Sequence, residues 1–224
     1  MIKLSTRLES ISSLVPINSN VIDIGCDHAL LDIYLYQNKI SNNIIASDIN
    51  VNALNNAIDN IKKNKLDNII ETRLGNGLDT LKDSDGVDTI IISGIGAHTA
   101  VGILENNQHK LNKINTIIIQ SNTKLELLRK EVTKLNYIID NEIIIEDNKK
   151  TYTIIKFIKG KKRYTKKELY FGPILLKTNT KLFQEYIKKE LAKLELYLKL
   201  LPKYNIIDRH KIKKEIRLYH NVID

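Results

Sequence analysis

The chain has 224 residues, enough for one well-buried domain with an appendage but short for two domains with separate cores. With 42% hydrophobic and 27% charged residues, its composition excludes an extensively disordered chain and a membrane-embedded one. The formal net charge is +9, and residues 161–224 hold 17 Lys and Arg against 7 Asp and Glu, so this segment carries the excess and favours a polyanionic partner such as nucleic acid.

Five apolar runs of strand length occupy the first part of the chain, and each is followed by a helical pattern. Strands are expected at 21–25, 44–49, 69–75, 87–94 and 114–121, and helices near 28–38, 51–64, 97–109 and 123–136. Runs this apolar, without clean alternation, suit strands that are covered on both faces. The alternation of strand and helix predicts a parallel, doubly wound sheet.

Two further apolar runs, at 138–146 and 151–160, are separated only by the sequence DNKK (147–150), which predicts a hairpin turn. A closing hairpin added to a parallel sheet is the arrangement of Rossmann-like methyltransferases, whose sheet ends with an antiparallel strand. We therefore expect an α/β fold, with a Rossmann-like class I methyltransferase domain over residues 1–160 and a mostly parallel seven-stranded sheet.

The last 64 residues have a different character. The stretch 161–173 resembles a linker, and two helical patterns follow it, the second with Asn205 and Asp208 placed as N-cap and first-turn acid. Apolar residues recur at spacings of three and four, at Ile187, Leu191, Leu194, Leu198 and Leu201 before Pro202, and then at Ile212, Ile216, Tyr219 and Ile223. The spacing predicts that residues 161–224 form a coiled-coil-like helical hairpin. Its basic charge favours RNA binding, although a solvated, lysine-rich helical surface would have the same composition.

The most informative motif is VIDIGCDHALLDIYL (21–35), in which an apolar strand ends at Asp23 and Gly25 just before a helix. Gly25 allows a tight turn and the close approach of a ligand to the carboxyl edge of the sheet. Asp48 ends the next strand, about 20 residues further on, where an acid accepts hydrogen bonds from ribose hydroxyls. The ligand should therefore contain a nucleoside.

The first loop also indicates which nucleoside cofactor binds. A dinucleotide needs a glycine-rich loop for its pyrophosphate, whereas this loop has one glycine beside Asp23, Asp27 and His28. Carboxylates repel phosphate but favour the sulfonium and ammonium of S-adenosylmethionine, so we predict S-adenosylmethionine and disfavour an NAD-dependent oxidoreductase. The candidate cofactor-binding residues are Asp23, Gly25, Cys26, Asp48, Ile49, Gly75, Asn76, Gly77, Ser93 and Gly94.

Two glycine-containing loops follow the third and fourth predicted strands. In RLGNGL (73–78) the amide of Asn76 can hydrogen-bond an adenine edge, although a plain β-turn would use the same residues. In SGIGAHTA (93–100), Gly94 and Gly96 leave room either for a flat base beside the sulfonium or for close helix packing. The sequence lacks the Asn/Asp-Pro-Pro-aromatic signature at this place, which shifts the target from an exocyclic amine towards a ring nitrogen or another nucleophile.

The chain resembles the bacterial TrmK family in the segments VPINSNVIDIGCDHALLDIYL, ASDIN, RLGNGL, SGIGAH, IIIQSN, YTIIKFIKG and FGP. The most specific feature is the combination of DHA after the first glycine with QSN after the fifth strand. The resemblance extends over nearly the whole chain. It implies methylation of N1 of adenine 22 in tRNA, by a Rossmann-like domain followed by a coiled-coil-like helical tail.

Three residues are candidates for a catalytic role. Adenine N1 has a neutral lone pair, so positioning and electrostatics should dominate its methylation. We expect Asp27 to stabilise the developing charge or accept a hydrogen bond from the base, with capping of the next helix as its alternative role. His28 and Asn122 are expected to orient the base, and a structural role stays open for both. A nucleophilic Cys26 would imply C5-pyrimidine chemistry and is disfavoured.

The proposed target atom is inaccessible in paired or stacked RNA, so we expect the base to be extruded into the pocket. The basic residues expected to hold phosphates near the pocket are Lys161, Lys162, Arg163, Lys166 and Lys167, and those expected to reach farther along the tRNA are Lys203, Arg209, Lys211, Lys213, Lys214 and Arg217. Alternatives are a non-catalytic RNA-binding module that binds S-adenosylmethionine, and a methyltransferase acting on another RNA position or on a small molecule.

The sequence also carries expectations about location and assembly. No apolar run reaches the roughly 20 residues that span a bilayer, and the N-terminus resembles no signal peptide. We expect a cytoplasmic protein that contacts no membrane. One cysteine allows no internal disulfide, and no Cys/His cluster has zinc spacing, so we expect no metal. A monomer is expected rather than a dimer.

Overall fold

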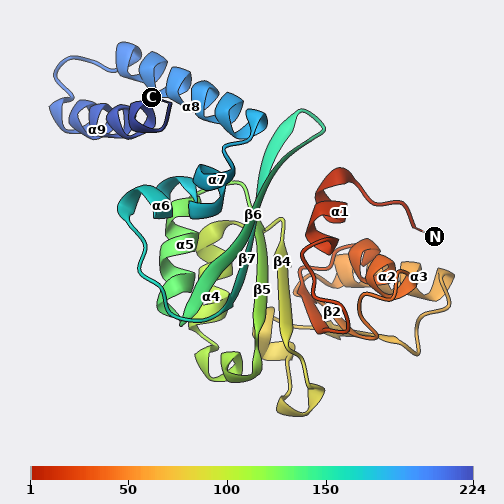
Figure 1. Ribbon diagram of the computed structural model, residues 1–224. Helices are drawn as coiled ribbons and strands as arrows, with labels where there is room; N and C mark the ends of the chain where they lie inside the picture. Colours follow the sequence, from red (N-terminus) through yellow and green to blue (C-terminus); the bar gives the residue numbers. More distant parts are fainter. Residues whose placement is uncertain (1, 224) are drawn as a thin grey trace.

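The computed structural model describes residues 2–223, and its centre is a seven-stranded sheet between two layers of helices (Figure 1). The strands are β1 (Asn20–Ile24), β2 (Asn43–Asp48), β3 (Ile70–Leu74), β4 (Thr89–Ser93), β5 (Thr116–Ser121), β6 (Tyr137–Asp147) and β7 (Lys150–Lys159). Their order is β3-β2-β1-β4-β5-β7-β6, with β1 to β5 parallel and β7 antiparallel to both of its neighbours. The predicted fold is confirmed.

Helices cover both faces of the sheet. One layer contains α1 (Thr6–Ser12), α2 (Leu30–Gln37) and α3 (Val51–Lys63), and the other contains α4 (Ala97–Glu105) and α5 (Leu125–Lys134), with short helical turns at η1 (Gly77–Thr80), η2 (Asp83–Asp85) and η3 (Gln108–Lys113). In β4, Ile90 and Ile92 pack with α4 and α5, while Ile91 packs with the other layer. All three are fully buried, and burial of each stabilises the fold by about 1.5–3 kcal/mol.

The β6–β7 hairpin turns at Asn148 and Lys149, whose φ angles are 50° and 64°. Two consecutive positive φ values are typical of the two-residue turn that matches the twist of antiparallel strands. The turn predicted at 147–150 is thus confirmed, although the strands extend to Asp147 and Lys150 themselves.

Two helical regions were not predicted from the sequence. The short helix α1 is capped by Ser5, whose hydroxyl accepts from the amide of Leu8. The stretch expected to be a linker contains α6 (Lys166–Phe171), with a reciprocal cap between Thr165 and Glu168, and leads into α7 (Pro173–Thr178). No helix among residues 2–223 combines the length and the apolar character needed to cross a membrane.

A buried ion pair attaches α6 and α7 to the domain. Arg129 of α5 donates from Nε to Glu142 Oε1 of β6 over 2.7 Å, and from Nη1 to the carbonyls of Leu169 and Tyr170 over 3.1 and 2.9 Å. Glu142 Oε2 accepts from the amide of Ile174 over 3.0 Å. Gly172 completes the contact, because its φ is +95° and a Cβ there would lie 2.5 Å from Glu142 Oε2.

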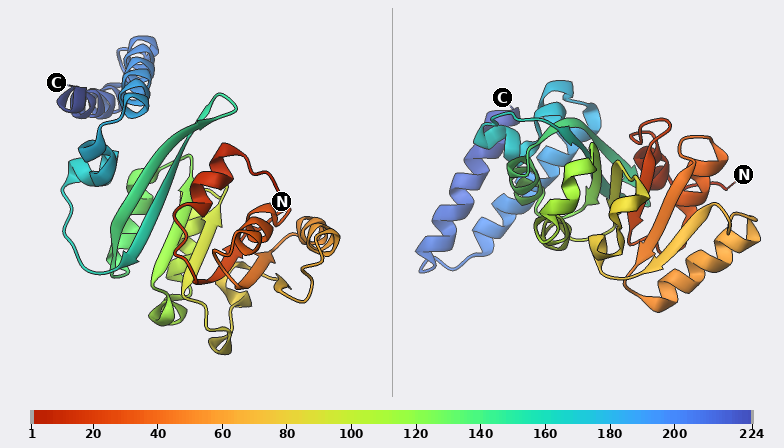
Figure 2. Two further views of the ribbon diagram at one scale, coloured as in Figure 1. Left: turned by 45° about the vertical axis from the view of Figure 1, so that its right-hand side comes forward. Right: turned by 90° about the horizontal axis from the view of Figure 1, so that it is seen from below.

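The chain ends in a hairpin of two long helices, α8 (Lys181–Leu200) and α9 (Ile206–Ile223), which lie side by side and project from the sheet (Figure 2). Asn205 caps α9 as predicted, accepting from the amide of Asp208 over 3.4 Å. Near the root of the hairpin, Ile187, Leu191 and Tyr219 are buried together with Phe171 of α6 and Ile144 of β6. The coiled-coil geometry stays a prediction, and the side chain of Ile223 lies outside the described residues.

Candidate functional site

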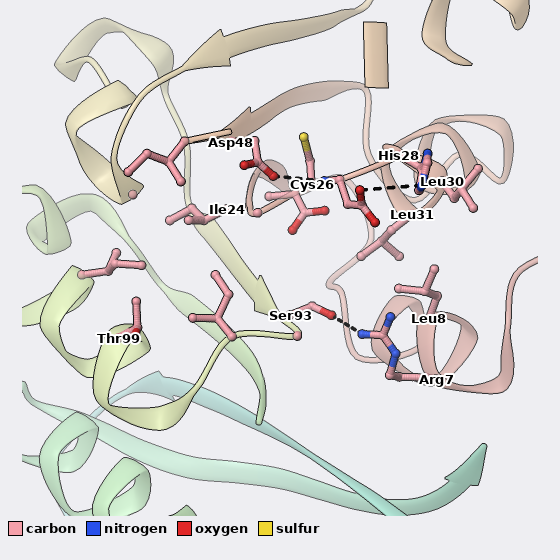
Figure 3. Close-up of a pocket in the computed structure, with 18 of the residues that line it drawn as sticks. Arg7, Leu8, Ile24, Cys26, His28, Leu30, Leu31, Asp48, Ser93 and Thr99 are labelled. Atoms are coloured by element: carbon pink, nitrogen blue, oxygen red, sulfur yellow. Dashed lines mark hydrogen bonds and ion pairs between the residues drawn. The ribbon is translucent and has the colours of Figure 1, made fainter. Parts of the chain in front are cut away.

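A cavity of about 710 Å³ opens at the carboxyl ends of β1, β2 and β4, the edge where ligands bind in parallel α/β sheets (Figure 3). Its wall includes every predicted cofactor-binding residue: Asp23, Gly25, Cys26, Asp48, Ile49, Gly75, Asn76, Gly77, Ser93 and Gly94. Asp27 and His28 line it as well, but Asn122 does not. Lining residues that the sequence reasoning missed include Ser5, Arg7, Leu8, Ile95, Thr99 and Ile103.

The loop after β1 is held against β2. The amides of Gly25 and Cys26 both donate to the carbonyl of Ser47, over 2.8 and 3.1 Å. Gly25 has a φ of +81°, which disfavours other residues at this turn. Burial, reinforced by neighbouring carboxylates, raises the pKa of the Cys26 thiol far above its ordinary value, so the thiol stays protonated. Cys26 is therefore part of the wall and is not an activated nucleophile.

Asp48 ends β2 with its carboxylate directed into the cavity (Figure 3). Its Oδ1 accepts from the amide of Asn50 over 2.8 Å, and its Oδ2 accepts from the amide of Asp27 over 3.3 Å. These two contacts fix the carboxylate, and each oxygen retains a lone pair for another donor. A ribose diol matches this arrangement.

Asp23 lies deeper in the same wall. Its side chain is 4% exposed, and its Oδ1 has no hydrogen-bond partner among the described residues. Burial and, to a smaller extent, the Asp48 carboxylate raise the pKa of Asp23 to about 7, while Arg7 opposes the shift. A buried carboxyl without a partner fits a cationic ligand group, and two carboxyls in one wall disfavour a phosphate. The cavity thus fits S-adenosylmethionine.

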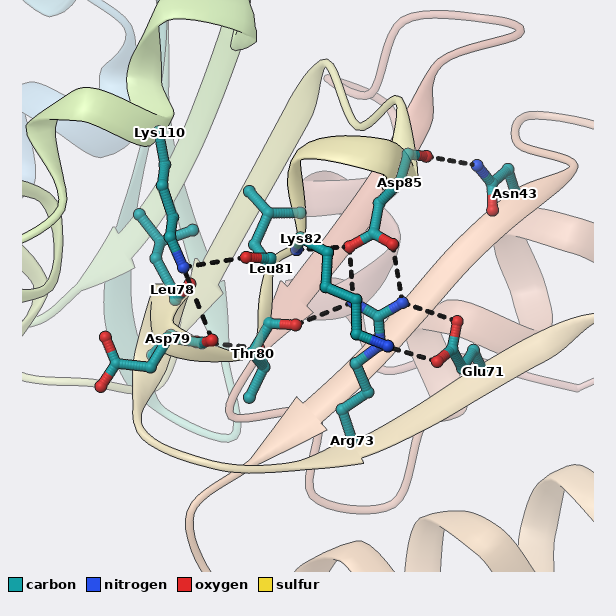
Figure 4. Close-up of polar contacts among 11 residues, drawn as sticks. Asn43, Glu71, Arg73, Leu78, Asp79, Thr80, Leu81, Lys82, Asp85 and Lys110 are labelled. Atoms are coloured by element: carbon teal, nitrogen blue, oxygen red, sulfur yellow. Dashed lines mark hydrogen bonds and ion pairs between the residues drawn. The ribbon is translucent and has the colours of Figure 1, made fainter.

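A polar cluster behind the cavity fixes the loop that carries Gly75, Asn76 and Gly77 (Figure 4). Arg73 of β3 donates to both oxygens of Asp85, over 2.5 and 2.8 Å, and to the carbonyl of Thr80 over 2.8 Å. Its guanidinium lowers the pKa of Asp85. From the other side, Lys110 donates to the carbonyls of Leu78 and Leu81, over 2.7 and 2.8 Å.

A second hydrogen-bond network joins α1 to the ends of β4 and β5. Arg7 Nη1 donates to Ser93 Oγ over 2.8 Å (Figure 3) and to Gln120 Oε1 over 3.0 Å. Gln120 Oε1 also accepts from the amide of Gly94, and Gln120 Nε2 donates to Asn122 Oδ1 over 2.7 Å. Asn122 is therefore connected to the cavity wall through Gln120, although it lies outside the wall.

Asp27 and His28 lie at the mouth of the cavity. The Asp27 side chain is 67% exposed, and its Oδ1 is 3.7 Å from His28 Nε2. The alternative role of Asp27 as a helix cap is wrong, because α2 begins at Leu30 after Ala29, and no side chain among the described residues caps it. The carboxylate of Asp27 therefore remains available to a ligand.

Part of the predicted phosphate-binding set lies away from the cavity. Because β7 is antiparallel, its end at Ile158 pairs with Thr116 at the start of β5. Lys161, Lys162 and Arg163 follow β7 at the edge of the sheet opposite the cavity. The expectation that they hold phosphates near the pocket is therefore wrong, and the reversal of β7 is the reason.

Comparisons with known proteins agree with this geometry. The family model TrmK, described as tRNA (adenine(22)-N(1))-methyltransferase, matches residues 21–221. The tRNA (adenine(22)-N(1))-methyltransferase of Bacillus subtilis is 29% identical over 154 residues, which span 69% of this chain and 64% of that enzyme.

Solved structures resemble nearly the whole chain, and two of them contain S-adenosyl-L-methionine or S-adenosyl-homocysteine. The structure of M. capricolum TrmK with S-adenosyl-homocysteine is 33% identical, with a TM-score of 0.89 over 99% of this chain and 98% of that one. The structure of Streptococcus pneumoniae Sp1610 with S-adenosyl-L-methionine is 29% identical, with a TM-score of 0.93 over 99% of this chain and 100% of that one.

Proposed function

The chain belongs to the TrmK family, and we propose on that premise that it transfers the methyl group of S-adenosylmethionine to N1 of adenine 22 in tRNA. The observation that carries the proposal is the cavity at the ends of β1 and β2, where Asp23 and Asp48 face one space of about 710 Å³ within the matched residues. A volume of this size suits a nucleoside cofactor together with part of a base.

Different residues of the cavity wall suit different parts of the cofactor. Asp48 accepts hydrogen bonds from the ribose hydroxyls, and the exposed side chain of Ile49 beside it covers one face of the adenine. Asn76, in the loop fixed by Arg73, is placed for the adenine edge. Asp23 receives the ammonium of the methionine part. S-adenosylmethionine supplies an activated methyl group carried by a sulfonium.

The target base enters beside Ser93 and Gly94, at the end of β4. Gln120 and Arg7 hold this part of the wall, and Asn122 extends the same network towards solvent, where it orients the base. Asp27 and His28 lie at the mouth of the same cavity. Because the attacking adenine nitrogen needs no strong base, these residues act by orientation and by stabilising the positive charge that the base acquires.

Replacing Asp27 by alanine is expected to lower methyl transfer about tenfold while cofactor affinity changes little. The effect is moderate because the Asp27 side chain is 67% exposed, and water screens the attraction between its carboxylate and the positive charge on the base. The measurement is transfer of labelled methyl to unmodified tRNA, with the product nucleoside identified by mass spectrometry. Asp67→Ala, at an exposed aspartate outside the cavity wall, is the control. Wild-type protein that forms no N1-methyladenosine would refute the proposed function.

Residues 161–224 act as the RNA-binding arm of the enzyme. The excess of Lys and Arg in this segment supports the assignment. Positively charged side chains are attracted to the RNA phosphates, and each contact releases counterions from the RNA. In the root of the arm, α8 and α9 bury Leu191 and Tyr219 within one chain, which supports a monomer. A tRNA substrate supports a cytoplasmic location.

Neutralising Lys213 and Lys214 on α9 is expected to weaken tRNA binding and to lower its salt dependence. Both side chains are exposed, and each phosphate contact contributes about 0.7–0.9 to the slope of log affinity against log salt. Lys213→Gln/Lys214→Gln should therefore reduce the slope by about 1–2 in titrations at several salt concentrations. The matched control is Lys62→Gln/Lys63→Gln, at exposed lysines of α3. An equal change of the slope in both double variants would argue against RNA binding by residues 161–224.

A further inference from the structure

Asp32 is a buried acid that the reaction described above does not use. It lies in the first turn of α2, its side chain is fully buried, and neither of its carboxyl oxygens has a hydrogen-bond partner among the described residues. An ionised carboxylate in such a place would cost several kcal/mol, so the group must be neutral or must share a proton with a neighbour.

The neighbour is Asp23. The two buried carboxyls lie close enough for each to shift the pKa of the other, and Asp23 Oδ1 also has no donor among residues 2–223. Two adjacent carboxyls can form a hydrogen bond only if one of them is protonated. Asp32 does not line the cavity, whereas Asp23 does. The pair therefore has an inner member, Asp32, away from the cavity and an outer member, Asp23, that faces it.

We propose that Asp32 keeps a proton and donates it in a hydrogen bond to Asp23, so that Asp23 faces the cofactor as an oriented carboxylate. Asp32 is then a positioning residue for the ammonium of S-adenosylmethionine, and the inference rests on the proposed function for the identity of that ligand. The proton stays on Asp32 when the ligand binds, and no bond is made or broken.

The charged groups around the pair set the direction of its pH dependence. Burial and Asp48 of β2 raise the pKa of Asp23 to about 7, and Arg7 of α1 opposes this, while burial and the neighbouring Asp23 raise the pKa of Asp32 well above its usual range. Near the pair, the thiol of Cys26 stays protonated. As the pH rises through about 7, Asp23 loses its proton while Asp32 keeps its own, so affinity for a cationic ligand should rise and then level off.

The test compares Asp32→Asn with Asp32→Ala, using S-adenosyl-homocysteine as the probe, because it has the same ammonium and needs no tRNA. An asparagine amide donates the same hydrogen bond without a titratable proton, so at about pH 8 the affinity of Asp32→Asn should stay within about twofold of wild type. Alanine removes a hydrogen bond to a charged acceptor, so affinity should fall at least about tenfold, and its rise with pH should move to higher pH. Asp59→Asn, at an exposed acid of α3, is the control.

Infrared spectroscopy provides a readout that is independent of binding. At about pH 8, wild type should show the carbonyl band of one buried carboxylic acid, and both Asp32 variants should lack it. Absence of the band from wild type, equal affinity of wild type and Asp32→Ala, or equal weakening by both substitutions would overturn the proposal. If Asp32→Ala does not fold, the affinity of Asp32→Asn and the infrared band of wild type still test the proposal. Failure of wild type to bind the probe would instead count against the proposed cofactor.

Discussion

Replacing Asp48 by alanine is expected to weaken S-adenosylmethionine binding about 100-fold. Asp48 is 9% exposed, and the amides of Asn50 and Asp27 fix its carboxylate. Two hydrogen bonds from ribose hydroxyls to this charged acceptor contribute about 1.5 kcal/mol each, and their sum of about 3 kcal/mol corresponds to about 100-fold in affinity. Isothermal titration calorimetry with S-adenosyl-homocysteine measures the loss.

The same substitution has a second, electrostatic consequence. Because the Asp48 carboxylate helps to raise the pKa of Asp23 to about 7, its removal should move the pH-dependent rise in ligand affinity to lower pH. Asp79→Ala, at an exposed acid outside the cavity wall, should change neither the affinity nor its pH dependence. A decrease in affinity of less than about threefold for Asp48→Ala would show that the ribose lies elsewhere.

Replacing Arg129 by alanine is expected to lower the free energy of unfolding by about 3–5 kcal/mol. The Arg129 side chain is 1% exposed and that of Glu142 is 0% exposed, so the substitution leaves a buried carboxylate without its cation. The carbonyls of Leu169 and Tyr170 lose their donor as well. Urea unfolding followed by circular dichroism measures the difference.

The neighbouring residue provides the control for this substitution. Lys130→Ala removes a side chain that is 55% exposed from the same helix, and it should change the unfolding free energy by no more than about 0.5 kcal/mol. If Arg129→Ala were no more destabilising than Lys130→Ala, the buried ion pair would contribute little to the attachment of α6 and α7.

The sheet could be predicted from the sequence because its strands are unusually explicit. The isoleucine-rich runs of β4 and β5 are buried on both faces. The loops that follow β1 to β4 contain the residues that indicate the edge of the sheet where the cofactor binds. The predicted cofactor-binding residues lie at adjacent strand ends, and parallel strands bring such ends together. Local pattern and topology therefore sufficed to predict this side of the cavity.

The other side depends on contacts that no local pattern reveals. Arg7 lies in a seven-residue helix and meets Ser93, 86 positions away, only because α1 packs across the end of the sheet. Asp32 has the pattern of an ordinary polar residue on a helix, and its burial beside Asp23 follows from how α2 docks. The reversal of β7, which the predicted hairpin implied, moves Lys161 to the far edge of the sheet.

The contact between Arg129, Glu142 and Gly172 has a mechanical consequence for substrate choice. It holds α6 and α7, on which the base of the helical hairpin packs, and the first helix of the hairpin has 20 residues and thus a length of about 30 Å. A projecting element that is fixed at one end behaves as a cantilever, and its free end stays at a set distance from the cavity. If the hairpin binds RNA as proposed, the enzyme selects its substrate by length, because only an RNA fold that presents a reactive base and a phosphate backbone at that spacing contacts the cavity and the hairpin at once.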